Sequence, residues 1–220
     1  MSMFPWYILL LPLFAAVAII LVTRSSRELS SFLSVAAVLG SFVCSCFVFV
    51  RPDIQATSLT WINVPPILNI PLGLVLDHLS KTMLVLVTGI GTLIHIYSLG
   101  YMRDDAGKSR YFASLSFFMF SMLGIVLADN FVMMFIFWEL VGVSSYLLIG
   151  HWFERQPAAE AAKKAFITNR LGDFGFMLGI LMVWTATGSA VFHDIAQQLD
   201  RVTSYPGYLT AATLLIFCGA

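Results

Sequence analysis

The chain has 220 residues, of which 59% are hydrophobic and only 11% are charged, and its 12 basic side chains balance its 12 acidic ones. An ordinary soluble domain has about 25% charged residues, so this chain has too few polar side chains to cover a water-exposed surface. The balanced charge gives it no attraction to polyanions. The composition therefore excludes a soluble globular domain, a disordered chain and a nucleic-acid-binding protein, and it indicates a membrane protein.

Six long apolar segments follow one another, each close to the roughly 20 residues that a membrane-spanning helix needs. The first is not a signal peptide, because no basic residue precedes it and Arg24 and Arg27 follow it. The last apolar run has no polar flank, so we expect the N-terminal fragment of a longer polypeptide. We expect six complete spans and a truncated seventh that starts near residue 207, the complete spans being residues 3–23, 29–50, 79–99, 111–128, 131–150 and 165–186.

The connection between the second and third spans has the pattern of a β-hairpin. Residues 52–78 contain two runs, Ser58–Val64 and Leu68–Leu76, with β-branched or aromatic residues in partial alternation. Pro65-Pro66 separates the two runs. The sequence therefore predicts an all-α membrane protein, a polytopic transmembrane helix bundle that carries a small outside β-hairpin.

Two further connections have recognisable patterns. Residues 189–200 place apolar side chains at helical spacing, which predicts a short amphipathic helix at the membrane interface. Asp129 and Asn130 are typical of a tight turn, and they also place a capping residue at the start of span five.

Basic residues are distributed unequally between the two sets of loops. Short loops rich in Lys and Arg stay on the inner side of a membrane, so we expect the N-terminus and the hairpin outside. Eight basic residues lie in loops predicted inside and three in loops predicted outside: Arg24, Arg27, Arg103, Lys108, Arg110, Arg155, Lys163 and Lys164 against Arg51, Lys81 and Arg201.

Span five has a single ionisable residue, Glu139, close to its middle. A carboxylate at that depth is costly unless it is paired, hydrated or protonated. Glu139 is therefore either a neutral side chain hydrogen-bonded to a neighbouring helix or a proton-carrying site, and its isolation favours the second interpretation. Gly142, Ser144 and Ser145 follow it and form a small, polar stretch that can admit water or close helix contact.

Span six carries several charges. Arg170 and Asp173 are three residues apart, so they share a helix face and can pair. Lys164 precedes Arg170 by six residues, and Lys163 is expected to extend toward the inner surface. The Arg170–Asp173 pair either locks helix packing or switches and biases the charge of Glu139, and the sequence leaves both possibilities open.

His95, near the inner end of span three, is a weaker candidate for proton relay, because histidine titrates near neutrality but also serves in packing. Cys44, Cys46 and Cys218 lie in apolar runs and predict neither a disulfide framework nor a metal site. The chain has no glycine-rich phosphate loop and no Cys-x-x-Cys motif, so it is expected to bind no cofactor itself.

Three stretches carry a resemblance to a known family: GIGTLIHIYSLGYM (89–102), LADNFVMMFIFWELVGVSSYLLIGHWF (127–153) and KKAFITNRLGDFGFMLG (163–179). Together they cover most of residues 72–185. They resemble the large antiporter-like subunit of proton-pumping NADH–quinone oxidoreductase, respiratory complex I, which is subunit L in bacteria and subunit 5 in mitochondria. The resemblance implies the first part of an inverted-repeat fold with a broken helix in each repeat.

The same resemblance implies the function of the buried charges. In this family a chain of ionisable residues crosses the membrane arm at mid-depth and translocates protons, coupled to NADH oxidation and quinone reduction. The acid of span five corresponds to Glu139, and the Lys, Arg and Asp of span six correspond to Lys164, Arg170 and Asp173. The family's lysine of span seven would follow soon after Ala220. NADH, FMN, iron–sulfur clusters and quinone would be held elsewhere in the complex.

The resemblance also implies partners and a location. Other membrane-arm subunits and the lipid bilayer would surround the chain, with a bacterial inner membrane favoured over the mitochondrial one. We expect residues 1–78 to form a two-helix segment with the outside hairpin, and residues 79–220 to begin the translocating domain. Two alternatives stay open: the large subunit of a multisubunit monovalent cation/proton antiporter, which shares the FWEL motif, and a purely structural membrane scaffold.

Overall fold

A computed structural model of the chain describes residues 3–51, 54, 58–64, 68–202 and 206–219. It is helical apart from a two-stranded antiparallel sheet of β1 (Leu59–Val64) and β2 (Leu68–Leu72). The first helix ends in a π-helical turn, η1 (Ile19–Thr23). The α-helices are α1 (Phe4–Ala18), α2 (Arg27–Val50), α3 (His78–Tyr101), α4 (Lys108–Leu127), α5 (Phe131–Ile149), α6 (Gln156–Thr187), α7 (Phe192–Val202) and α8 (Pro206–Gly219).

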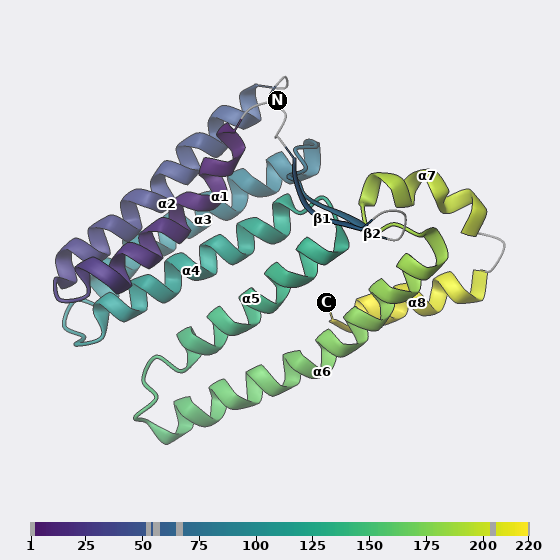
Figure 1. The fold of residues 1–220 in the computed structure, drawn as a ribbon. Coiled ribbons are helices and arrows are strands. Elements are labelled where there is room, and N and C mark those ends of the chain that lie inside the picture. Colours follow the sequence, from purple (N-terminus) through teal and green to yellow (C-terminus); the bar gives the residue numbers. More distant parts are fainter. Residues whose placement is uncertain (1–2, 52–53, 55–57, 65–67, 203–205, 220) are drawn as a thin grey trace.

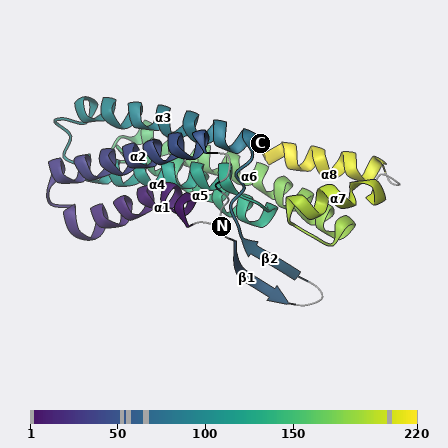
Figure 2. The same ribbon diagram turned by 90° about the horizontal axis from the view of Figure 1, so that it is seen from above.

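Helices α1 to α6 are long and apolar enough to cross a membrane, with α1 and η1 forming one span. The prediction of an all-α, multi-pass membrane protein is therefore confirmed. In Figure 1 the six helices run roughly parallel, and α1 to α4 form one compact group, with α5 and then α6 beside it. Figure 2, seen from above, shows the hairpin projecting from one end of this bundle. Helix α8 packs along α6.

Most of the predicted boundaries agree with the structure, but the start of span six was wrong. The sequence placed Lys163 and Lys164 in an inner loop before residue 165, whereas α6 begins at Gln156 and contains both. Pro157 occupies the first turn, where proline is well tolerated, and the alanine-rich segment after it has a high helix propensity. At 1.5 Å per residue the 32-residue helix is about 48 Å long, so it extends beyond a hydrocarbon core of about 30 Å.

The hairpin end of the bundle is tied together by the turn at Asp129 and Asn130. The Asn130 side chain accepts a hydrogen bond from the Met133 N–H at 2.8 Å, which caps α5, and donates another to the Pro71 carbonyl of β2 at 2.9 Å. The Phe192 N–H donates to the Asp129 carbonyl at 3.1 Å. One turn therefore joins the sheet, α5 and the start of α7. The second strand ends at Leu72, earlier than predicted, and the Pro65-Pro66 break lies outside the described residues.

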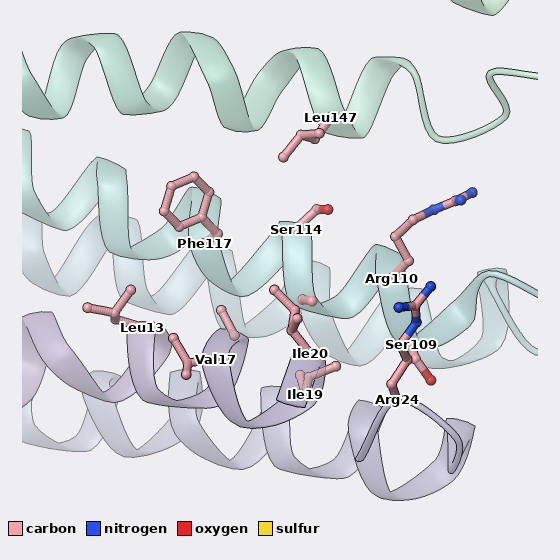
Figure 3. A pocket seen from close by; sticks show the side chains of 12 residues that line it. Leu13, Val17, Ile19, Ile20, Arg24, Ser109, Arg110, Ser114, Phe117 and Leu147 are labelled. Carbon is pink, nitrogen blue, oxygen red and sulfur yellow. The ribbon is translucent and has the colours of Figure 1, made fainter. Parts of the chain in front are cut away.

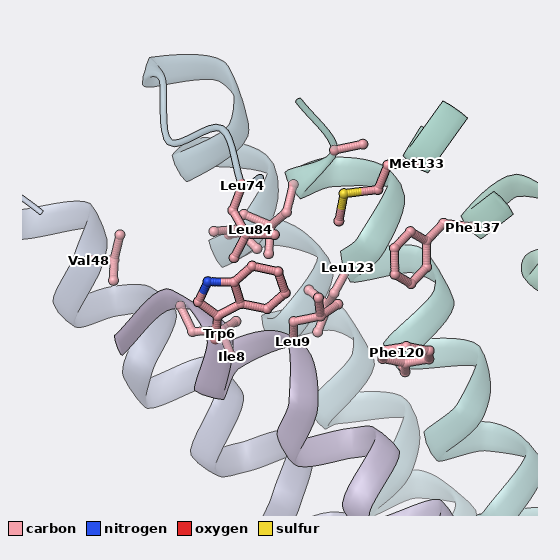
Figure 4. Packing of buried hydrophobic residues seen from close by; sticks show 12 residues of the cluster. Trp6, Ile8, Leu9, Val48, Leu74, Leu84, Phe120, Leu123, Met133 and Phe137 are labelled. Atoms are coloured by element: carbon pink, nitrogen blue, oxygen red, sulfur yellow. The ribbon is translucent and has the colours of Figure 1, made fainter. Parts of the chain in front are cut away.

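A hydrophobic cluster fills the bundle near this end (Figure 4). Trp6 and Leu9 of α1 meet Leu123 of α4, and the rings of Phe120 and Phe137 pack edge to face with centroids 5.2 Å apart. Aromatic pairs of this kind add about 0.5–1.5 kcal/mol beyond the area that they bury. The cluster holds α5 in register with α4.

Small polar side chains fill the contacts of α2 with its neighbours. Ser34 contacts the hydroxyl of Ser116 on α4 at 2.6 Å, and Ser41 donates to the Ile8 carbonyl on α1 at 3.0 Å. Serine permits close approach of helices and satisfies its hydroxyl on a neighbouring backbone. These serines explain how α2 packs against α1 and α4 with few large side chains between them.

Candidate functional site

Three charged side chains meet between α5 and α6. The guanidinium of Arg170 forms an ion pair with the carboxylate of Glu139, and its Nη1 lies 3.6 Å from Oδ2 of Asp173. Arg170 Nη2 also donates to the Glu139 backbone carbonyl at 3.2 Å. The structure thus shows the Arg170–Asp173 pairing that their spacing predicts. It also adds a direct link to Glu139, 31 residues away, which spacing could not reveal.

Local sequence explains why the arginine reaches this position. A Cβ atom at Gly142 would lie 3.2 Å from Arg170 Nη2, so the bare backbone of α5 leaves room for the guanidinium. The ring of Phe166, one turn earlier on α6, lies 4.6 Å from the guanidinium carbon and supports it by a cation–π contact. The small stretch identified after Glu139 therefore receives the arginine.

Burial differs across the cluster. Asp173 has only 6% of its side chain exposed, whereas Glu139 and Arg170 have 26% and 27%. Charged groups in a membrane face the interior of a helix bundle or a water-filled cavity. The exposed sides of Glu139 and Arg170 therefore require further protein or water beside α5 and α6.

A cavity of about 300 Å³ adjoins the cluster. Asp173 lines it together with the polar side chains of Thr168 and Asn169, and Cys218 and Gly219 of α8 form another wall. Liquid water occupies about 30 Å³ per molecule, so the space is large enough for several water molecules. In addition, Arg170 Nε is buried without a hydrogen-bond partner among the described side chains. Carboxylate, amide and hydroxyl groups around a hydratable space are suited to proton transfer.

Two other predicted residues are not brought into the cluster. Lys164 is exposed near the start of α6, and it forms no ion pair within the described part of the chain. This end of the bundle, opposite the hairpin, also carries Arg103, Arg110 and Arg155 and is called the basic end. His95 is fully buried in α3, with its Nδ1 2.7 Å from the Gly91 carbonyl and its ring facing Phe112 of α4. The contacts of His95 therefore lie in another part of the bundle from α5 and α6.

Two polar contacts at the basic end were not predicted. Lys108, buried at the start of α4, pairs with Glu28 of α2 at 2.8 Å. Asp105 accepts a hydrogen bond from Trp152 Nε1 at 2.7 Å and one from the Gly107 N–H at 2.6 Å. Burial opposes ionisation of Asp105, but these hydrogen bonds outweigh it and hold its pKa below the usual range. The Lys108–Glu28 pair joins residues 80 apart and the Trp152–Asp105 bond joins residues 47 apart, so local sequence patterns give no sign of these two contacts.

Comparisons with known proteins agree with this architecture. Residues 61–112 match the family described as NADH-ubiquinone oxidoreductase (complex I), chain 5 N-terminus, and residues 128–220 match NADH:quinone oxidoreductase/Mrp antiporter, transmembrane. The chain is 42% identical over 99% of its length to NAD(P)H-quinone oxidoreductase subunit 5 of the Zygnema circumcarinatum chloroplast. It is 40% identical over 97% of its length to chain 5 of Synechocystis sp.. It spans about a third of the length of these relatives, 33% and 34% respectively.

Solved structures share the fold. An archaeal membrane-bound sulfane sulfur reductase contains a chain that matches 99% of this one with a TM-score of 0.83 and 18% identity, over 44% of its own length. The Mrp complex from Dietzia sp. gives a TM-score of 0.82 at 24% identity, with 99% of this chain and 23% of the other covered. Sequence and fold agree, and the chain belongs to the family of antiporter-like subunits represented by chain 5 of NADH–quinone oxidoreductase, complex I.

Proposed function

We propose that the chain is part of a membrane-arm subunit that translocates protons in an NAD(P)H–quinone oxidoreductase. The observation that carries the proposal is the cluster of two carboxyl groups and one guanidinium at the middle of α5 and α6. The curated relatives, which are subunits of such oxidoreductases, support the assignment to the complex. The redox cofactors NADH, FMN, iron–sulfur clusters and quinone would then be bound by other subunits.

The charge of the cluster provides a mechanism. With both carboxyl groups ionised, Glu139, Asp173 and Arg170 carry a net charge of −1, which is costly in the hydrocarbon region. One bound proton, or the approach of another cation, restores neutrality. Arg170 contacts both carboxylates. When one of the two acids binds a proton, the ion pair between Arg170 and the other acid becomes stronger. The cluster is therefore a one-proton site whose occupancy responds to nearby charge.

Lys164 completes the proposed pathway at the basic end. It precedes Asp173 on α6 by nine residues, about 14 Å along the helix. That distance excludes a direct contact and requires water or further side chains between the two. We therefore assign Lys164 to the entrance of the pathway and the cluster to its middle. His95, buried among α3 and α4 contacts, is left as a secondary candidate.

The domain organisation and the partners of the chain can be proposed from the helix packing and from the exposure of the cluster. We propose that residues 79–220 begin the translocating unit and that residues 1–78 support it through the packing of α1 and α2 on α3 and α4. The partly open face of Glu139 and Arg170 requires protein or water beside it, which supports other membrane-arm segments as partners. For the location we propose a bacterial inner membrane in preference to the mitochondrial one.

The test is Glu139→Gln in the full-length protein within its complex. Glutamine keeps the size and can still accept a hydrogen bond from Arg170, but it carries no exchangeable carboxyl proton. We expect normal assembly on native gels and a loss of most of the proton pumping per NADH oxidised in vesicles. Glu154→Gln, at an exposed position outside the spans, is the matched control and leaves pumping unchanged. Pumping at the wild-type ratio by an assembled Glu139→Gln complex would refute the proposal and favour a structural role.

The same complex distinguishes the proposed function from a cation/proton antiporter. An antiporter would exchange Na⁺ or K⁺ for protons without NADH. Proton movement that needs NADH and quinone supports the oxidoreductase, whereas cation-driven proton movement without NADH supports the antiporter.

A further inference from the structure

A second cavity, larger than the one beside Asp173, lies away from the charged cluster. It has a volume of about 520 Å³ and is formed by α1, η1, α4 and α5, within the range of about 300–1,000 Å³ typical of ligand sites. Its walls include the apolar side chains of Val17, Ile20, Phe117 and Leu147. Val17, Ile20 and Leu147 are 43%, 57% and 44% exposed, so the cavity is a trough that opens on the outer surface of the bundle.

The two ends of this trough differ in charge. Figure 3 shows Arg24 and Arg110 at one end, with Leu13 and Phe117 at the other. Arg110 is held in place by a hydrogen bond to the His151 carbonyl at 2.8 Å and by a contact with the ring of Phe153. Both of these partners are uncharged. Among the described residues neither arginine pairs with a carboxylate.

Two acidic side chains at this end are engaged elsewhere, and two others, Asp104 and Glu154, form no ion pair with either arginine among the described residues. Glu28 pairs with Lys108 at 2.8 Å, and Asp105 binds Trp152 and lies 3.4 Å from His151. Ser109 provides a second polar group: it lines the trough, is 5% exposed, and its Oγ has no hydrogen-bond partner within the described part of the chain. Two cations and one buried hydroxyl without a hydrogen-bond partner therefore lie at one end of the apolar trough.

We infer that this trough binds an anionic phospholipid, with its phosphate between Arg24 and Arg110 and an acyl chain along Val17, Ile20 and Phe117. The dimensions fit a single leaflet. From Leu13 to Arg24 the chain rises about 16 Å, roughly half of a 30 Å hydrocarbon core. The π turn Ile19–Thr23 widens the first span where the trough meets the arginines, and such turns are frequent at functional sites.

The two arginines and the length of the trough favour an anionic phospholipid over other occupants. A transmembrane helix of another subunit would fill an apolar surface across the whole bilayer, and an apolar helix would leave both arginines without a counter-charge. A zwitterionic lipid would bring its own cation close to two guanidinium groups. Basic pockets between transmembrane helices are suited to anionic headgroups, and each cation near such a surface contributes about fivefold in affinity.

The inference can be tested with two photoactivatable lipids that share one diazirine-bearing acyl chain, a phosphatidylglycerol and a phosphatidylcholine. The full-length protein in its complex is reconstituted with each lipid, irradiated, digested and mapped by mass spectrometry. We expect phosphatidylglycerol to label peptides that contain Val17, Ile20 or Phe117, well above phosphatidylcholine. Equal labelling of these peptides by the two lipids, or no lipid adduct on them, would overturn the inference.

Variants make the test specific. Removing both cations in Arg24→Gln/Arg110→Gln should lower the apparent affinity for phosphatidylglycerol by about 25-fold. Arg103→Gln/Arg155→Gln removes two exposed cations from the same end outside the trough and should leave the labelling unchanged. Ser114→Trp fills the trough with both arginines intact and should also abolish labelling. Wild-type labelling of the Ser114→Trp variant would contradict a site in the trough. So would a loss of labelling in Arg103→Gln/Arg155→Gln as large as that in Arg24→Gln/Arg110→Gln. The Ser114→Trp result decides the question even if the Arg24→Gln/Arg110→Gln variant fails to assemble.

Discussion

Asp129 shows how one side chain can carry a pH dependence of stability. It lies between Gly73 and Asn130 at the hairpin end, and Asn130 Nδ2 donates to its carboxylate at 2.6 Å. Burial nevertheless raises the pKa of Asp129 above its usual value of 3.8. Folding therefore favours the protonated form, and the resulting stability is full below pH 3.8 and is lost as the pH rises through the raised pKa.

We expect Asp129→Asn to remove this loss, because the amide has the same shape and no charge to bury. The measurement is the apparent melting temperature of the purified protein between pH 4 and pH 8. The advantage of the variant over the wild type should grow with pH and then become constant. Asp129→Glu, which keeps a carboxyl group, should not show this gain. A variant that is less stable than the wild type at pH 8 would show that the carboxylate is favourable there.

The contact between α6 and α8 depends on glycine. Gly179 packs so closely on α8 that an added Cβ would lie 2.8 Å from the Ala212 carbonyl oxygen and 2.8 Å from the Ile216 nitrogen. Both are backbone atoms, so the clash cannot be relieved by a side-chain rotation. Gly100, in α3, has nothing within 4 Å of the same position. Two glycines in transmembrane helices therefore have opposite expected responses to the same substitution.

We expect Gly179→Ala to push α8 away from α6 and to destabilise the protein by about 1–3 kcal/mol, as overpacking typically does. Gly100→Ala should be neutral or stabilising by up to about 1 kcal/mol, since alanine is the better helix former. Melting temperatures of the two variants in the same detergent provide the comparison. If Gly179→Ala melts at or above the wild-type temperature, the close approach of α8 is not required.

The whole molecule has a basic end and a hairpin end, and we propose that the basic end faces the inner side of the membrane. The basic loops and helix starts at this end include Arg103 and Arg155, which are exposed. The inner side of a membrane retains such segments. The proposed proton pathway runs from the basic end toward Glu139, so its direction depends on this orientation.

We expect Thr60→Cys, in strand β1, to react with a membrane-impermeant thiol reagent in intact cells. Asp104→Cys and Glu154→Cys, at the basic end, should react only after the membrane is permeabilised. All three positions are exposed, so the protein itself does not block the reagent, and the native cysteines are first replaced by serine. The reverse pattern would invert the orientation and place Lys164 at the outer end of the pathway.

Local sequence patterns were sufficient to predict the membrane-spanning helices and to place Glu139 near the middle of one of them. Apolar runs of about 20 residues identify spans because the hydrocarbon core imposes that length locally, and an acid at position 139 within 131–149 is at mid-depth wherever the helix packs. Local rules also predicted the hairpin and the amphipathic helix. They misplaced the start of α6, because apolarity marks the hydrocarbon boundary and not the end of a helix that continues into water.

Which charged side chains meet depends on how the helices pack against one another. Spacing along one helix pairs Arg170 with Asp173, but the contact with Glu139 depends on α5 and α6 lying side by side with Gly142 at the crossing. Lys108 and Glu28 pair across 80 residues, and the apolar trough that ends at Arg24 and Arg110 is formed by α1, η1, α4 and α5. Such contacts depend on helix packing, which is set by shape complementarity between distant segments and not by the local pattern of any one of them.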